Sequence, residues 1–219
     1  MAKINAINNK CEELTIDPGA SGDSFLQFDI NTTGEWRIGC DDTDDSFRIS
    51  QGSALGTNDT FIMTDAGERT MPLQPAFLGY HTLADSNVTG DGSVYTLGSG
   101  NALSEIFDQG GDFVTSGTFT APVDGRYYFS MSMQISGLAS GHNGEMRLVT
   151  SNGTYKLYKN NTVSMGSTVE YTSCAFVDMD ASDTATATLD IAGGAKTVDV
   201  AAGTLGAGAP TWFSGYLVA

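Results

Sequence analysis

The sequence predicts an all-β protein in which a polar arm and a short β-rich segment precede a C-terminal antiparallel β-sandwich. Three observations lead to this fold class. Apolar residues alternate with polar ones over several short runs, which is the period of a half-buried strand. No window of three turns shows a sustained helical period. The 27 glycines and 16% charged residues suit many strands and turns better than long helices.

The clearest strand covers residues 127–135. Its apolar or aromatic members fall on every second position and are Tyr127, Phe129, Met131, Met133 and Ile135. Side chains of a strand point to opposite faces in turn, so this strand has one buried and one wetter face. The run at 119–123 also alternates, and Asp124-Gly125 tolerates positive φ, so the two runs are predicted to form a tight hairpin. Pro122 cannot donate to a ladder and is placed at a strand end or edge.

Further runs complete the sandwich. Asn152-Gly153 predicts a two-residue hairpin turn. Residues 169–179 are apolar on both faces, as in a strand that is covered on both sides. Most of residues 81–104 is expected to be loop, with a strand at residues 94–97. Other alternating or apolar runs are predicted as strands and cover residues 154–158, 185–191, 196–200 and 212–219. A count of eight or more strands suits a two-sheet jelly roll, the predicted head, over residues 77–219.

Two motifs in this region are those of a known family. The first is FDQGGDFVTSGTFTAPVDGRYYF, and its matching positions are Phe107, Gly111, Phe113, Gly117, Phe119, Ala121, Pro122, Gly125, Tyr127 and Phe129. Asp108 stands where the family pattern has Asn, and the chain ends on the second motif, WFSGYLVA. Residues 75–219 therefore resemble the globular head of the complement recognition protein (the C-one-q domain), a tumour-necrosis-factor-like jelly roll. The resemblance implies that fold and a homotrimer, and it implies no activity.

The segment at residues 25–66 contains apolar pieces that are each too short to bury a face. Three copies wrapped around an axis would bury them, so we expect a short trimerising β-module. Its candidate packing residues are Trp36, Phe47 and Phe61. Residues 67–76, with Pro72 and Pro75, are predicted to be an extended linker.

This module also resembles a known type. GEWRIGCDDTDDSFRISQGSALGTNDTFIMTDAGE is similar to the short β-rich module of bacteriophage tail-fibre and other virion appendage proteins. The matching positions are Trp36, Ile38, Gly39, Asp41, Asp44, Phe47, Ile49, Gly52, Leu55, Gly56 and Phe61. Cys40 departs from the pattern, and the long repetitive shaft of typical fibres is missing.

Residues 1–24 are polar and Asn-rich, and they are predicted to be an anchoring arm that orders on virion capsid or tail proteins. The N-terminus has no apolar leader, so synthesis in the host cytoplasm without a signal peptide is expected. No apolar run approaches the length of a membrane span, so no membrane insertion is expected. The net charge of −16 argues against nucleic acid as a partner.

The sequence offers little chemistry. His81 and His142 lie in polar, loop-like sequence without a nucleophile motif, so the protein is predicted not to be an enzyme. A polysaccharide-cutting enzyme would need a carboxylate pair that sequence cannot define, and such appendages are usually longer. Calcium is the one cofactor left open, and its candidate ligands are Asp41, Asp42, Asp44, Asp45, Asp178, Asp180 and Asp183. Solvated acidic turns explain the same residues.

The aromatic residues exceed what one sandwich face needs. Those near the two motifs are Tyr127, Tyr128, Phe129, Trp212, Phe213 and Tyr216. They are candidates for the core or for packing between subunits. Cys11, Cys40 and Cys174 are too widely spaced for a disulfide framework or a zinc site and are interpreted as small apolar residues.

The resulting hypothesis is a non-enzymatic homotrimeric surface protein of a bacteriophage virion, located on the capsid or on a tail appendage. The jelly-roll head would face outward and contact a host-surface glycan or protein. The alternative is a free bacterial lectin-like module that binds carbohydrate or protein.

Overall fold

The computed structural model describes residues 16, 18, 19, 21–30, 34–160 and 168–219 of the chain. In this part of the chain every named element is a β-strand, and every pairing is antiparallel. The chain divides into two compact units, Met1–Leu73 and Gln74–Ala219. The described residues include no helix with the length and apolar character that crossing a bilayer requires.

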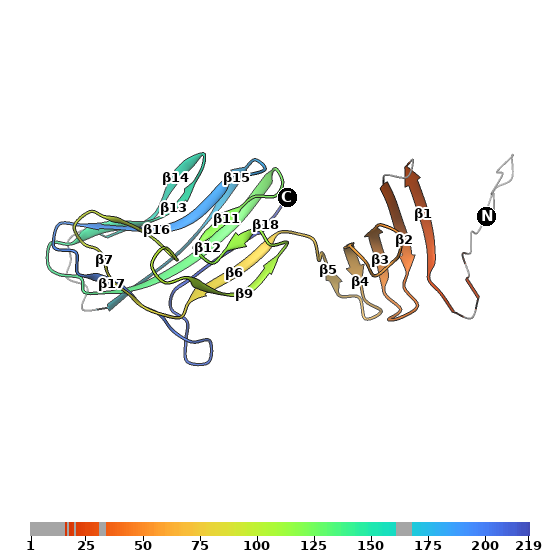
Figure 1. Ribbon diagram of the computed structural model, residues 1–219, viewed down its shortest axis with the longest axis horizontal. Coiled ribbons are helices and arrows are strands. Elements are labelled where there is room, and N and C mark those ends of the chain that lie inside the picture. The colour runs from red at the N-terminus through yellow and green to blue at the C-terminus, as the bar shows by residue number, and fades with distance from the viewer. Residues whose placement is uncertain (1–15, 17, 20, 31–33, 161–167) are drawn as a thin grey trace. The chain divides into compact units, whose positions relative to one another are not determined.

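The N-terminal unit is one five-stranded meander in the order β1-β2-β3-β4-β5. Its strands are β1 (Ser24–Ile30), β2 (Gly34–Cys40), β3 (Phe47–Gln51), β4 (Asp59–Met63) and β5 (Arg69–Thr70). Consecutive strands pair with each other, so this sheet is built entirely from neighbours in the sequence (Figure 1). Within the described residues of this unit, the sheet has two faces and no second layer packs on it.

The C-terminal unit, the head, is built from two packed sheets (Figure 1). One has the order β10-β11-β16-β13-β14 with β8 on β16, and the other has the order β7-β17-β12-β18-β6-β9 with β15 on β12. The strands of the first sheet are β8 (Val94–Thr96), β10 (Phe113–Val114), β11 (Thr118–Thr120), β13 (Asn143–Thr150), β14 (Gly153–Asn160) and β16 (Thr184–Ala192). Those of the second are β6 (Ala76–His81), β7 (Asp85–Thr89), β9 (Leu103–Gln109), β12 (Gly125–Ser136), β15 (Thr168–Met179), β17 (Val198–Val200) and β18 (Trp212–Leu217).

The strand order makes the head a jelly roll. The neighbours β6-β18-β12-β15 form one layer and β11-β16-β13-β14 form the other, so the first strand of the roll lies beside the last. The chain therefore crosses repeatedly between the layers instead of completing one sheet first. The predicted all-β jelly-roll fold is confirmed by this topology.

The core lies between the two layers and is rich in aromatic rings. Alternate residues of β12 from Tyr127 to Ile135 are fully buried, as their spacing predicts. The Phe77 ring stacks on Phe113 at 4.4 Å between centroids and meets Phe213 edge-on at 5.1 Å. Gly215 makes room for this packing, because a Cβ there would lie 2.5 Å from the Phe129 ring. The buried rings thus fix the spacing of the layers.

The predicted hairpin at Asp124-Gly125 is wrong. β11 pairs with β10 and β16 in one sheet, whereas β12 lies in the other sheet. The turn carries the chain across the sandwich, and the Phe119 and Phe129 rings meet in the core from opposite layers at 5.6 Å. Both runs alternate because both have an inward face, and alternation does not reveal the pairing partner.

Other local predictions have mixed outcomes. The hairpin at Asn152-Gly153 is confirmed by the pairing of β13 with β14. Residues 81–104 hold more strand than expected, because β7 and the first residues of β9 lie there beside β8. The predicted cover on both faces of residues 169–179 is wrong, since Cys174 and Phe176 are exposed. Most of the predicted arm at residues 1–24 lies outside the described residues.

Candidate functional site

The outer face of the larger sheet of the head carries apolar side chains where water would favour polar ones. On β6 the core-facing residues are Phe77, Gly79 and His81, so Ala76, Leu78 and Tyr80 point outward. The same alternation turns three residues of β18 outward. We call this surface the head face, and its members are Ala76, Leu78, Tyr80, Ile106, Phe107, Tyr128, Ser130, Cys174, Phe176, Trp212, Ser214 and Tyr216.

The strand register aligns the head face in rows. Tyr128 lies opposite Phe176 on one side and opposite Tyr216 on the other. Their rings contact at centroid distances of 5.0 Å and 5.4 Å, so one aromatic row spans three strands. Phe176 is 64% exposed and Tyr216 is 47% exposed, although large aromatic side chains normally lose most of their exposure in a protein. The row is therefore available to a partner.

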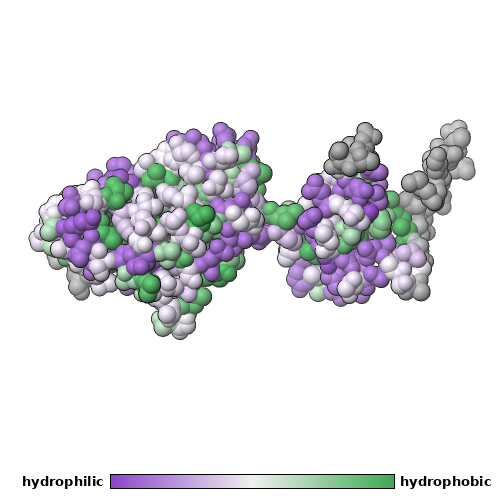
Figure 2. Space-filling model, viewed as in Figure 1, coloured by the Kyte–Doolittle hydropathy of each residue, from purple (hydrophilic) through white to green (hydrophobic). Residues whose placement is uncertain are grey.

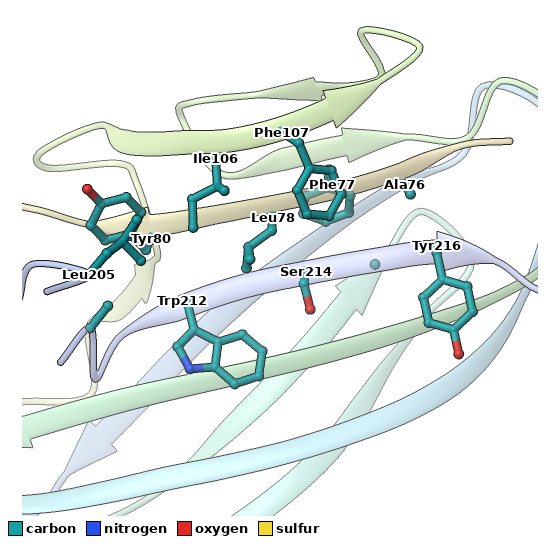
Figure 3. A pocket seen from close by; sticks show the side chains of 12 residues that line it. Ala76, Phe77, Leu78, Tyr80, Ile106, Phe107, Leu205, Trp212, Ser214 and Tyr216 are labelled. Carbon is teal, nitrogen blue, oxygen red and sulfur yellow. The ribbon is translucent and has the colours of Figure 1, made fainter. Parts of the chain in front are cut away.

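Next to this row the face is hollowed into an open groove of about 560 Å³. Figure 3 shows Trp212, Ser214 and Tyr216 projecting from one side of β18, with Leu78 of β6 beside them. Leu205, which is 59% exposed, lines the groove from the loop between β17 and β18. The lining is apolar apart from a few hydroxyl groups, so it suits apolar contact better than recognition of a charged ligand.

Charged groups lie only at the margins of the head face in the described structure. Arg126 and Asp178 oppose each other at one end of the β12–β15 pair. Near the other end, Ser132 donates to the Glu170 carboxylate at 3.0 Å. Between these ends, a hydrogen bond with the Cys174 thiol raises the pKa of Tyr128 further above its ordinary value of 10.0. The centre of the face is uncharged.

The predicted packing residues fall into three groups. Tyr127, Phe129 and Phe213 are fully buried in the core of the head. Trp212 and Tyr216 lie on the head face. Trp36, Phe47 and Phe61 lie in the N-terminal unit, on one face of its sheet.

Both histidines are buried, which corrects the expectation of surface loops. His81 ends β6 with no exposed surface, and its Nε2 lies 3.4 Å from the Asp85 carboxylate. Asp85 also accepts a hydrogen bond of 2.5 Å from the Tyr95 hydroxyl, whose pKa is raised by burial and by this carboxylate. His142 is 2% exposed, and its Nδ1 accepts the amide of Ala139 at 3.0 Å. These contacts fix the fold locally and leave neither ring open to a substrate.

The candidate calcium ligands are engaged in local contacts. Asp41, Asp44 and Asp59 surround the Arg48 guanidinium at 3.2, 2.6 and 2.5 Å. The Asp183 carboxylate accepts hydrogen bonds from the backbone amide of Asp180 at 2.9 Å and from the side-chain amide of Asn152. Both bonds hold the turn that precedes β16. Asp178 lies on β15, Asp42 accepts the amide of Gly22, and Asp45 is an exposed residue between the turn at residues 42–44 and β3. These contacts give structural roles to the carboxylates of Asp41, Asp42, Asp44 and Asp183, and calcium stays a prediction.

Among solved structures, the chain is similar to domains of complement and tumour-necrosis-factor proteins. The globular domain of zebrafish complement 1qA is 18% identical, with a TM-score of 0.44 over 67% of this chain and 98% of that chain. Murine APRIL at pH 8.5 is 7% identical, with a TM-score of 0.44 over 66% and 99% of the two chains. The Eiger tumour necrosis factor of S. frugiperda is 8% identical, with a TM-score of 0.41 over 67% and 94%. No protein-family model and no curated protein matches the chain.

Sequence reasoning missed most of the head face. Of its members, only Tyr128, Trp212 and Tyr216 were candidates for contact between subunits. Phe176 belongs to the run at 169–179, whose apolar residues on both faces were the available signal. Leu78 and Phe107 meet only through the pairing of β6 with β9, which no local pattern indicates.

Proposed function

We propose that the protein is a non-enzymatic homotrimer that displays its jelly-roll head at the surface of a bacteriophage virion. The observation that carries the self-assembly is the head face. It joins exposed aromatic residues of β12, β15 and β18 to an apolar groove and has an uncharged centre. A patch of this size and composition on a chain of net charge −16 is the part of its surface best suited to contact a further copy.

Trimer formation gives the head face its cover. Each copy presents the same face, and in a closed ring of identical subunits the head face of every copy is buried against a neighbour. The resemblance of residues 107–129 to the complement head motif favours three subunits over two. The Tyr128 hydroxyl lies inside the face, and its pKa is raised, so burying this group removes no charge from water.

The placement on a virion is supported by the N-terminal sequence. Residues 34–61 carry the spacing of a fibre-type module, and residues 1–24 have the composition of an arm that orders on a partner. We propose that this arm binds capsid or tail proteins while the head faces outward. The loop at residues 137–142, which is rich in small and polar residues, is a candidate contact with a host-surface glycan or protein.

A complementation experiment tests the virion role. A phage that lacks the gene is supplied with the full chain, with a chain that lacks residues 1–24, or with a loop variant in which the exposed residues Ala139 and Ser140 are both replaced by glutamate. We expect the full chain and the loop variant to enter purified particles and the arm deletion to be absent from them. Adsorption to host cells is then scored for the loop variant. Absence of the full chain from particles, or normal incorporation without the arm, contradicts the proposal.

A further inference from the structure

The N-terminal unit has a polar interior. The Arg48 guanidinium lies on one side of its sheet and pairs there with Asp41 and Asp59. Ser50 has no exposed surface and donates to Asp59 at 2.5 Å. The loop after β3 closes over this side, since the amide of Gly56 donates to Asp59 at 3.2 Å. The side of the sheet that the loop covers is therefore stabilised by ion pairs and hydrogen bonds and not by apolar packing.

The opposite side of the same sheet is apolar and has no cover within the described residues. Its central row follows the register Leu26, Ile38, Ile49 and Phe61 across β1 to β4. Phe28 with Trp36 flanks the row on one side, and Cys40, Phe47 and Met63 flank it on the other. We call these residues the module face.

The exposures on the module face show that it lacks a cover. Phe28 is 56% exposed, Leu26 is 45% exposed and Trp36 is 36% exposed. Among the described residues of this unit, Leu55 is the one buried hydrophobic side chain. A five-stranded sheet without an apolar core is not stable by itself, so the module face must be covered for the unit to fold.

We infer that the module face packs against the module faces of further copies of this chain, so that the apolar core of the N-terminal unit forms between subunits. The cover has to be present whenever the chain folds, and another copy of the same chain meets that condition. Arg69 on the edge strand β5 continues the row of Cys40, Phe47 and Met63, and it is the one charged side chain among the described residues of these rows. Acidic copies can therefore approach each other through this face with little repulsion. A different protein could cover the module face only if it were made at the same time and in the same amount as this chain.

The inference rests on the proposed homotrimer and extends it to a second surface. Once heads associate, the N-terminal units are tethered to one another through the chain near Leu73 and Gln74, where the two units divide. Tethering through short connections raises the local concentration to the millimolar range. At this local concentration even weakly binding module faces would be fully associated, and no other protein would be needed to cover them.

Two native thiols allow the two surfaces to be tested separately. Cys40 lies on the module face and Cys174 on the head face, and both are exposed in the single chain. The full chain is pulsed with N-ethylmaleimide, and peptide mapping gives the rate at each cysteine relative to the same protein in urea. We expect both thiols to react about tenfold more slowly, or slower still, in the native protein. Ile49→Glu should expose Cys40 and leave Cys174 protected, whereas the exposed loop variant Ser53→Glu should change neither.

Each outcome has a defined meaning. Reaction of Cys40 in the native wild-type chain at the unfolded rate overturns the inference, and this result does not depend on any variant folding. Reaction of Cys174 alone at the unfolded rate overturns the head interface and leaves the module inference standing. In a Phe176→Glu background, Cys40 protection should fall on dilution. If Cys40 protection in that background does not depend on protein concentration, the cover comes from the same chain, and the inference is overturned. Protection of Cys40 that is found only in assembled virions also overturns it.

Discussion

The two outer faces of the head differ although the inner faces behind them are alike. On the smaller sheet, outward positions carry threonines and a charge network. There Arg147 pairs with Glu145 and Asp190 at 2.5 Å each, and Lys156 pairs with Glu145 at 2.9 Å. We call this surface the polar face. On the larger sheet, the head face carries the aromatic row and the groove.

The difference indicates which face suits water and which suits contact with protein. Both inner faces bury apolar side chains, such as Leu189 on the smaller sheet and Met131 on the larger, so packing in the core requires apolar residues on the inner face of both sheets. The outer faces do not pack in the core, so the core does not determine which residues they carry. Over the visible side of the head in Figure 2, hydrophobic residues are interspersed with hydrophilic and neutral ones, as expected of a surface in water. The polar face suits water, and the head face suits protein.

The largest expected effect comes from a charge in the aromatic row. Phe176→Glu places a carboxylate where Tyr128 and Phe176 pack, and three such charges would meet in the assembled trimer. We expect dissociation to monomers at micromolar concentration, measured by light scattering. The matched control is Thr186→Glu, which puts the same charge on the polar face. The comparison fails if both variants stay trimeric or if both dissociate.

Two neighbours on β18 give the next effect, because they face opposite ways. Phe213 is fully buried, so Phe213→Ala should lower the free energy of unfolding by about 3–5 kcal/mol at every protein concentration. Trp212 lines the groove, so Trp212→Ala should lower the urea midpoint more as the protein is diluted. Urea titrations at two protein concentrations measure both. A concentration-independent effect of Trp212→Ala would place it outside any interface.

Breaking the charge network should have a smaller effect. Arg147→Met removes the partner of Glu145 and Asp190, whose side chains are 10% and 22% exposed. We expect the head to lose about 1–2 kcal/mol in urea unfolding, without a change of mass. The Lys156 side chain is 63% exposed, so Lys156→Met should cost no more than about 0.5 kcal/mol. A change of oligomeric state in Arg147→Met would show that the polar face also contacts a subunit.

The smallest effect is a dependence on pH. The hydrogen bond from Lys156, together with Arg147, holds the pKa of Glu145 below its ordinary value of 4.5. A folded-state pKa below the unfolded one stabilises the protein fully above the unfolded value, and this contribution is lost as pH falls through the folded pKa. Glu145→Gln should therefore reduce the loss of stability on acidification. Urea midpoints of wild type and variant from about pH 6 to about pH 3 measure the difference, and parallel curves would contradict it.

The strands whose inward face is covered by the chain itself could be predicted from the sequence. Residues 127–135 and 185–191 alternate because one side of each packs in the core, and both became strands with the expected residues buried. The partner of a strand could not be predicted in the same way. Phe119 and Phe129 have equivalent patterns but belong to opposite sheets.

The head face was signalled but misread. Residues 169–179 were interpreted as apolar on both sides and predicted to form a strand that is covered on both faces, although Glu170, Thr172 and Asp178 lie on its outer side. Phe176 is exposed in the single chain, and in the proposed trimer a further subunit would supply its cover. The groove itself could not be predicted, because Leu205 and Phe107 are brought together by the topology of the roll.

The acidic run at residues 41–45 illustrates the same limit. Its sequence suggests a solvated turn or a calcium loop, yet Asp41 and Asp44 pair with Arg48. That pairing depends on β3 and β4 bringing Arg48 and Asp59 side by side, and no spacing within the run indicates it. Burial of an ion network is a property of the folded sheet.

The central claim is that the head face joins three copies of the chain. Light scattering of the purified full chain across nanomolar to micromolar concentrations tests it most directly. The account predicts a mass three times that of the 22.9 kDa chain throughout most of this range. A mass of 22.9 kDa at micromolar concentration would contradict it.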